Sequence, residues 1–115
     1  MNVFIEDKDI AWEHPDPGIR RKVMAYNEQL MLVKVEFQQG AVGALHEHYH
    51  SQMSHVESGV FEITIDGEKK VLKAGDAYYI PPHVVHGALC LEPGVLIDVF
   101  SPYREDFVKR EGVER

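Results

Sequence analysis

The amino-acid sequence predicts an all-β sandwich or barrel. Short apolar stretches recur at intervals of roughly 8 to 12 residues, and Gly, Pro and Asp separate them. No long helical period occurs before residue 102. A chain of 115 residues has room for one hydrophobic core and is too short for two domains. We therefore expect a single all-β domain.

The domain is expected to have three parts in chain order. They are N-terminal edge strands (1–28), the barrel (29–100) and a C-terminal tail (101–115). Near the start, Val3–Ile5 and Ile10–Trp12 are predicted to be short strands joined by polar turns. Trp12 either anchors a second subunit or caps its own barrel. In the tail, Pro102–Arg110 contains the segment able to form a short helical turn.

Two longer strands are predicted before residue 40. The segment 18–25 carries basic side chains on both faces. Its alternation does not decide whether Arg20 or Arg21 points inward, where an arginine could hold a ligand carboxylate. Residues 29–38 form a half-buried strand that places alternate apolar side chains on one face, namely Met31, Val33, Val35 and Phe37.

The second half of the chain reads as a series of hairpins. Asp66 and Gly67 form a strong two-residue turn signal after a strand at 60–65 that points Phe61, Ile63 and Ile65 inward. Further strands are predicted at 69–72, 77–80, 84–91 and 95–100, with a turn at Glu92–Gly94 before the last one.

The last strand carries a candidate acid. Asp98 and Phe100 share one face, and Val95, Ile97 and Val99 share the other. One of these sets faces the mouth of the barrel. If it is the set with Asp98, a carboxyl beside a metal ion could act as a general acid or base, whereas an outward Asp98 would only face solvent.

The composition argues against several classes of partner. A formal net charge of −7 provides no positive field for nucleic acid or for an anionic membrane surface. The sequence shows neither an apolar run long enough to span a membrane nor a charged-then-apolar leader. A single cysteine, Cys90, cannot form an internal disulfide and favours a reducing compartment. We expect a cytoplasmic protein.

A group of histidines predicts a metal site. In an extended strand His46 and His48 point to the same face and can reach one ion. A straight strand would carry Gln52 far outside the coordination sphere, so the chain must bend near Tyr49–Ser51 to bring Gln52 back on a neighbouring strand. His86 can complete the set from a third strand. The expected ligands of a divalent ion are thus His46, His48, Gln52 and His86.

The other histidines have no partner at ligand spacing. His14, His55 and His83 are interpreted as surface or structural residues. His50 has the parity of an inward residue but falls in the required bend, so it is a possible support for the ligands.

The ligand types indicate what the ion could bind. Three neutral imidazoles and a neutral amide leave the charge of a divalent cation uncompensated, which favours an anionic, chelating ligand such as a hydroxylated carboxylic acid. The same lack of an anionic ligand counts against a redox oxygenase. Zn, Ni, Fe, Mn and Cu all suit such a site, so the metal is not identified.

Two spaced motifs carry a resemblance to a known family. In the first motif, five residues separate Gly40 from His46, one separates His46 from His48, three separate His48 from Gln52 and six separate Gln52 from Gly59. In the second motif, five residues separate Gly75 from Pro81 and four separate Pro81 from His86. Together they resemble the paired motifs of the cupin family, which implies a jelly-roll barrel, or double-stranded β-helix, over about 29–100. The resemblance also implies metal ligands at the two histidines, the amide and the distant histidine. Gln52 stands where that family most often has Glu, His83 where it usually has Gly, and Cys90 where it often has Asn.

The end of the chain narrows the resemblance. The run from Ile97 to Phe107, with Gln52 and the segment 18–22, is similar to KdgF-type pectin-degradation cupins. This implies metal-dependent conversion of unsaturated uronates, released by pectate or alginate lyases, to linear keto-deoxy uronates. The family's functional residues map onto Asp98, Phe100 and Arg104. The implied partner is a small anionic sugar acid, and a homodimer is expected because cupins of this size are commonly dimers.

Other functions fit the same motifs. A non-catalytic cupin that binds a metal and a sugar acid would keep the histidines and need no acid or base. A cupin dioxygenase acting on a thiol or diol would consume oxygen with iron. A purely structural barrel with a vestigial site would bind no metal.

Overall fold

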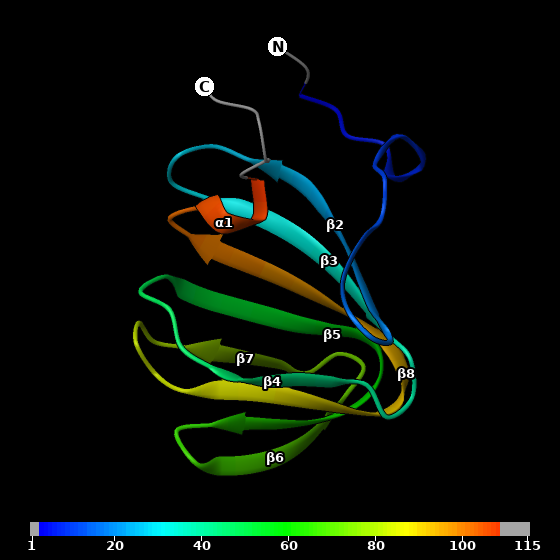
Figure 1. Cartoon of the computed structure of the whole chain (residues 1–115), viewed down its shortest axis with the longest axis vertical. Coiled ribbons are helices and arrows are strands. Elements are labelled where there is room, and N and C mark those ends of the chain that lie inside the picture. Colours follow the sequence, from blue (N-terminus) through cyan, green and yellow to red (C-terminus); the bar gives the residue numbers. More distant parts are fainter. Residues whose placement is uncertain (1–2, 109–115) are drawn as a thin grey trace.

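Strands make up most of the chain, which the computed structural model describes from residue 3 to residue 108 (Figure 1). The strands are β1 (Glu13–Asp16), β2 (Ile19–Tyr26), β3 (Met31–Phe37), β4 (Val42–His46), β5 (Ser51–Ile65), β6 (Glu68–Lys73), β7 (Ala77–Ile80) and β8 (His86–Ser101). A 3-10 turn, η1 (Asp7–Asp9), precedes them, and a short helix, α1 (Glu105–Val108), follows them. The predicted all-β fold and its C-terminal helical turn are confirmed. None of the described helices is long and apolar enough to cross a membrane.

Two long bent strands, β5 and β8, form the centre of both layers of the barrel (Figure 1). The first half of β5 pairs with the second half of β8, and β1, β2, β3 and β7 extend this layer. The second half of β5 pairs with the first half of β8, and β4 and β6 complete the other layer. This arrangement is the expected jelly roll.

Two glycines allow both long strands to bend at the same place. Gly59 on β5 has a φ of +83°, and a Cβ placed on it would lie 2.6 Å from the Cα of Gly94 on β8. Pairing continues on both sides of the bend, since Glu92 opposes Val60 and Val95 opposes Ser58. The turn predicted at Glu92–Gly94 is therefore a bend within one strand.

The inward faces of the strands change from apolar to polar toward the barrel mouth. Deep in the barrel the core contains Val56, Leu96 and the edge-to-face pair Phe37 and Phe61, whose ring centroids are 5.2 Å apart. Because inward positions alternate along a strand, β5 and β8 next present polar residues to the same interior, including Ser54, Gln52 and Asp98. Burying hydrogen-bonding groups at one end of an otherwise apolar barrel marks that end as the candidate site.

Several sequence predictions for the strands are confirmed. Met31, Val33 and Phe37 are buried on one face of β3, as are Phe61 and Ile63 on β5. Asp66 and Gly67 connect β5 to β6 with φ angles of 52° and 81°, the left-handed conformation that a tight hairpin turn requires.

The N-terminal prediction is partly wrong. No strand forms at Val3–Ile5 or Ile10–Trp12, and the first strand is Glu13–Asp16, because only there does the segment lie beside β2. Trp12 packs on its own chain, with the guanidinium carbon of Arg20 at 4.0 Å from its ring centroid. This contact supports the self-capping alternative for Trp12.

The close approach of the two bent strands gives a stability prediction. Replacing Gly94 with Ala places a methyl group against the backbone oxygen of Ser58, so the strands must separate, and we expect the free energy of unfolding to fall by about 1 to 3 kcal/mol. Gly43→Ala is the matched control, since its Cβ would have 3.7 Å to the nearest atom. Urea unfolding measures both, and equal stability of the two variants would contradict the prediction.

Candidate metal centre and adjoining pocket

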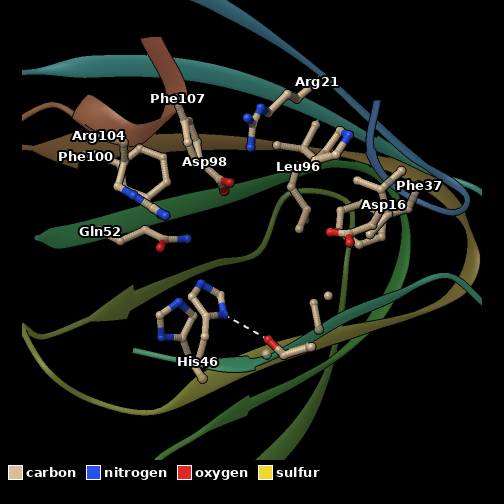
Figure 2. A pocket seen from close by; sticks show the side chains of 18 of the residues that line it. Asp16, Arg21, Phe37, His46, Gln52, Leu96, Asp98, Phe100, Arg104 and Phe107 are labelled. Carbon is tan, nitrogen blue, oxygen red and sulfur yellow. Dashed lines mark hydrogen bonds between the residues drawn. The ribbon is translucent and has the colours of Figure 1, made fainter. Parts of the chain in front are cut away.

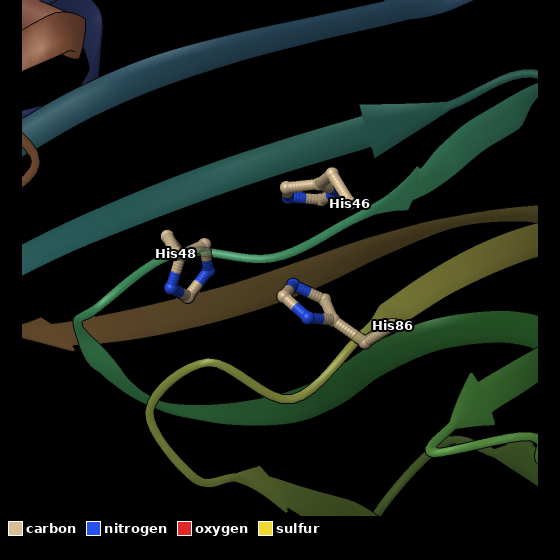
Figure 3. A group of neighbouring side chains, drawn as sticks. All are labelled: His46, His48 and His86. Atoms are coloured by element: carbon tan, nitrogen blue, oxygen red, sulfur yellow. The ribbon is translucent and has the colours of Figure 1, made fainter.

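Three histidines converge at the mouth of the barrel (Figure 3). His46 ends β4, His86 begins β8, and the two oppose each other in the pairing of these strands. His48 lies two residues beyond β4, in the connection to β5. One ligand atom from each ring lies within 4.8 Å of the others. The structure thus brings together the three histidines that the spacing singled out.

Each histidine is held by a backbone carbonyl at the ring nitrogen that faces away from the centre. Nδ1 of His46 lies 2.8 Å from the backbone oxygen of Ala44. Nδ1 of His48 lies 3.2 Å from that of His50, and Nδ1 of His86 lies 2.9 Å from that of Val84. Because a carbonyl only accepts, Nδ1 carries the proton in each neutral ring and Nε2 carries the lone pair. Lone pairs fixed in this way suit a metal ion.

The protonation of the rings also fits a cation. Burial, followed by the charge of Arg104, lowers the pKa of His48 to about 4. Burial likewise lowers the pKa of His86, whose Nε2 is buried and has no hydrogen-bond partner among the residues the structure describes. A buried lone pair without a donor is costly unless something else satisfies it. A divalent cation would satisfy it, so the residues present fit such an ion.

Gln52 joins the histidines from the neighbouring strand, as the predicted bend requires. Its Oε1 lies 3.0 Å from Nε2 of His48. With the His48 proton on Nδ1, both of these atoms present lone pairs, and about 3 Å is the spacing of adjacent ligands whose bonds to one ion are near 2.1 Å. The amide oxygen therefore completes a set of four uncharged donors.

A buried hydrogen-bond chain fixes the orientation of the Gln52 amide. Its Nε2 donates to Oγ of Ser54 at 2.9 Å, and that hydroxyl donates to Oδ1 of Asp98 at 2.6 Å. The hydroxyl has one proton, which goes to the carboxylate, so it must accept from the amide nitrogen. The amide oxygen is consequently turned toward the histidines.

Asp98 faces the interior of the barrel. It is 9% exposed, and Phe100 on the same face of β8 is 2% exposed, so this is the set of residues that points into the mouth. Burial raises the pKa of Asp98 to about 6, although the Ser54 hydrogen bond and the charge of Arg104 act in the opposite direction. A carboxyl with such a pKa can both accept and release a proton near neutral pH.

A pocket of about 390 Å³ connects these groups (Figure 2). Its polar lining includes His46, His86, Gln52, Asp98 and Arg104. The pocket is large enough for a small organic ligand and places the metal centre and the buried carboxyl on one cavity.

Arg104 forms part of the pocket wall beside two aromatic rings. Its Nε and Nη2 donate to the carboxylate of Asp106 at 3.1 and 3.0 Å. Its guanidinium carbon lies 5.2 Å from the ring centroid of Phe100 and 4.2 Å from that of Phe107. Asp106 and the rings hold the guanidinium in place, which leaves its outer N–H groups for a ligand.

The barrel region of the chain, residues 33–100, matches the cupin domain family. The chain belongs to the cupin family. It is 44% identical over 110 residues to the pectin degradation protein KdgF of Dickeya dadantii (strain 3937), covering 94% of this chain and 100% of that protein.

Two solved cupin structures are similar to the chain. An RmlC-like cupin from Shewanella frigidimarina NCIMB 400 is 46% identical, with a TM-score of 0.90 over 93% of this chain and 96% of that one. KdgF from Halomonas sp. is 43% identical, with a TM-score of 0.88 over 93% of this chain and 99% of that one. The cupin fold and the resemblance to KdgF-type cupins are therefore confirmed.

Sequence reasoning missed two polar residues of this cupin's site. Ser54 has the parity of Gln52 and could have been noticed as the next inward residue of β5. Glu105 had no signal in the sequence. It accepts a hydrogen bond from the Tyr49 hydroxyl and lies 3.0 Å from Nε2 of His50, and these contacts, led by that of Tyr49, lower its pKa to about 2. Glu105 thus ties α1 to the loop that carries His48.

Of the remaining four histidines, His50 adjoins the centre, with its ring centroid 5.2 Å from that of His48. His50 is buried against Glu105, in the supporting position that its parity suggested. The other three, His14, His55 and His83, are exposed. Within residues 3–108, the one group of three or more His, Cys, Asp or Glu side chains with metal-ligand geometry is His46, His48 and His86.

Removal of one histidine tests the metal centre. Loss of a residue that hydrogen-bonds a metal ligand weakens metal binding by roughly 10- to 100-fold. We expect His86→Ala to weaken Zn²⁺ binding by more than this, because the variant loses a buried ligand atom itself. His83→Ala is the matched control, since His83 is exposed and its Nδ1 lies 3.8 Å from Glu47. Calorimetric titration measures both affinities. Equal affinity in the two variants would place the ion elsewhere.

The buried carboxyl gives a pH-dependent stability prediction. Because the pKa of Asp98 is raised from 3.8 to about 6, the folded protein holds a proton that the unfolded chain releases between about pH 4 and pH 6. The free energy of unfolding therefore falls as the pH rises through that window, by up to about 3 kcal/mol. The Asp98→Asn variant has no carboxyl to titrate at this position, so its free energy of unfolding does not undergo this fall.

Urea unfolding of the wild type and Asp98→Asn at a series of pH values measures the effect. The variant should gain stability relative to the wild type as the pH rises from about 4 to 7, with most of the gain reached just above the pKa of about 6. A difference that stays constant over this range would show that Asp98 has an ordinary pKa.

Proposed function

We propose that this cupin opens the ring of an unsaturated uronate and yields a linear keto-deoxy uronate in the breakdown of pectin or alginate sugars. The observation that carries the proposal is a buried carboxyl, Asp98, with a pKa of about 6, on the same pocket as the histidine centre and Arg104. The similarity of this cupin to KdgF proteins over nearly its whole length supports the choice of substrate.

The ligand set accounts for substrate binding. A divalent cation held by His46, His48, His86 and Gln52 would supply a Lewis acid for the oxygen atoms of a sugar acid. Arg104, whose guanidinium is oriented by Asp106, offers its outer N–H groups to the substrate carboxylate. Phe100 supplies an apolar face for the sugar ring.

Asp98 moves the proton that the reaction requires. As the carboxylate, it removes the proton of the anomeric hydroxyl while the bond between C1 and the ring oxygen breaks, which leaves an aldehyde at C1 and an enolate at C5. The carboxyl then returns that proton to C4 as the enolate becomes a ketone, and Asp98 is again a carboxylate. The substrate and product are isomers, so no further reactant is needed.

The arginine also contributes to the rate. Negative charge develops on the ring oxygen when the bond breaks, and Arg104 is close enough to the site for its charge to act on His48, His86 and Asp98. A well-placed donor to such an oxygen contributes about 3 to 4 kcal/mol to transition-state stabilisation.

Asp98→Asn tests the proposed role. Metal-loaded wild-type protein should accelerate the loss of ultraviolet absorbance of unsaturated galacturonate, and the variant should be slower by about a hundredfold to ten-thousandfold. Its affinity for saturated galacturonate should stay within a few fold of the wild type, because Asn keeps the shape of the side chain. Glu57→Gln, on the exposed face of β5, is the control.

Two results would contradict the proposal. Wild-type protein that binds galacturonate but does not consume the unsaturated sugar would be a binding cupin. An Asp98→Asn variant with full turnover would remove Asp98 from the mechanism.

A further inference from the structure

A second arginine, Arg21, lines the pocket. Of the two candidates on β2, Arg20 pairs with Glu36 and stacks on Trp12, whereas the side chain of Arg21 is 20% exposed and faces the cavity. The strand alternation left this choice open, and the structure decides it in favour of Arg21.

Arg21 and Arg104 lie on either side of one aromatic ring (Figure 2). The guanidinium carbon of Arg21 is 3.8 Å from the ring centroid of Phe107, and that of Arg104 is 4.2 Å from it. The ring fixes both cations and keeps them apart. The pocket therefore offers two separate points at which oxygen atoms of a ligand can be bound.

Fewer nitrogen atoms of Arg21 than of Arg104 donate hydrogen bonds to other side chains. Asp106 takes two donors of Arg104, while Glu13 takes only Nε of Arg21, at 3.0 Å. The two terminal nitrogens of Arg21 have no hydrogen-bond partner among residues 3–108. A guanidinium that is oriented by one carboxylate and has both terminal groups available is well prepared to bind further oxygens.

Of the two arginines, Arg21 lies on the wall farther from the histidines. Figure 2 shows Arg21 on the wall of the pocket opposite His46, and β2, which carries Arg21, belongs to the other layer of the barrel from β4, which carries His46. The Arg21 side chain is hydrogen-bonded to Glu13 on the adjacent strand β1, and Pro15, Asp16 and Ile19 of the β1–β2 hairpin line the same cavity. Arg21 thus lies toward the end of the cavity away from the metal centre.

This inference rests on the proposed function. We propose that Arg21 binds the hydroxyl or carbonyl oxygens at the end of the sugar acid remote from its carboxylate, so that the pocket selects six-carbon sugar acids over short hydroxy acids. In the ring these oxygens are the hydroxyls at C1 and C2. After ring opening the C1 aldehyde extends farther from the carboxylate, and the N–H groups of Arg21 can donate to it.

The role of Arg21 is tested by comparing a long and a short ligand in the wild type and in an Arg21 variant. The probes are D-galacturonate and glycolate, a two-carbon hydroxy acid that can chelate the metal ion but is too short to reach Arg21. Titration calorimetry on metal-loaded protein should show galacturonate binding about tenfold to a hundredfold more tightly than glycolate. Arg21→Gln should lose most of this preference and keep the wild-type affinity for glycolate. Arg20→Gln, its neighbour on β2, should behave as the wild type.

Other outcomes overturn the inference. Arg21→Gln that keeps the preference would show that Arg21 does not touch the ligand. Equal weakening of both ligands would assign Arg21 to the carboxylate end or to the shape of the pocket. If Arg21→Gln does not fold, Arg21→Lys replaces it, with the expectation of a reduced but measurable preference and unchanged glycolate binding.

The same proteins separate this inference from the proposed reaction. A wild type that does not consume unsaturated galacturonate, but whose preference for galacturonate depends on Arg21, would refute ring opening and support Arg21. A wild type that consumes the substrate, with a preference that Arg21→Gln leaves intact, would support ring opening and refute the role of Arg21.

Discussion

The site depends on one buried hydrogen-bond chain that crosses from β5 to β8. Asp98 accepts from Ser54, and Ser54 accepts from the amide nitrogen of Gln52, so the amide oxygen must face the histidines. A buried chain of this kind leaves little freedom, because each group that lost its partner would be unsatisfied in a medium of low polarity. The same chain therefore orients Gln52, the fourth candidate ligand, and holds the acid. It also explains why an amide rather than a carboxylate suits position 52, since a carboxylate could not donate to Ser54 and would repel Asp98.

The barrel makes this chain possible by bending its two longest strands at paired glycines. In that register Ser54 lies opposite Asp98, and Gln52 lies opposite Phe100, all on the inward face. The apolar core below supplies rigidity and low polarity, and the mouth holds the groups whose burial is costly. The raised pKa of Asp98 is a direct consequence of this placement. Stability is thus given up at the residue that the proposed reaction uses.

The sequence was most informative where one short segment determined the geometry. The convergence of His46 and His48, and the bend needed to return Gln52, could be predicted because backbone geometry limits side-chain direction over a few residues, although β4 ends at His46 and His48 lies two residues beyond it. The side on which Asp98 points depends on pairing with β5, and the contact between Glu105 and Tyr49 joins residues 56 apart, so neither follows from local pattern. The N-terminal strands were wrongly placed, because apolar residues alone do not provide a pairing partner. Metal identity, a homodimer and a cytoplasmic location stay predictions.

The most direct test of the hydrogen-bond chain is the pKa of Asp98, measured by carboxyl ¹³C NMR titration of the metal-free wild type and of Gln52→Glu. In the wild type we expect a pKa of about 6. In the variant two carboxylates would compete for the single proton of Ser54, so the pKa of Asp98 should rise further. A pKa that is unchanged or lower in the variant would show that Gln52, Ser54 and Asp98 are not connected, and would contradict the account of how this site is held together.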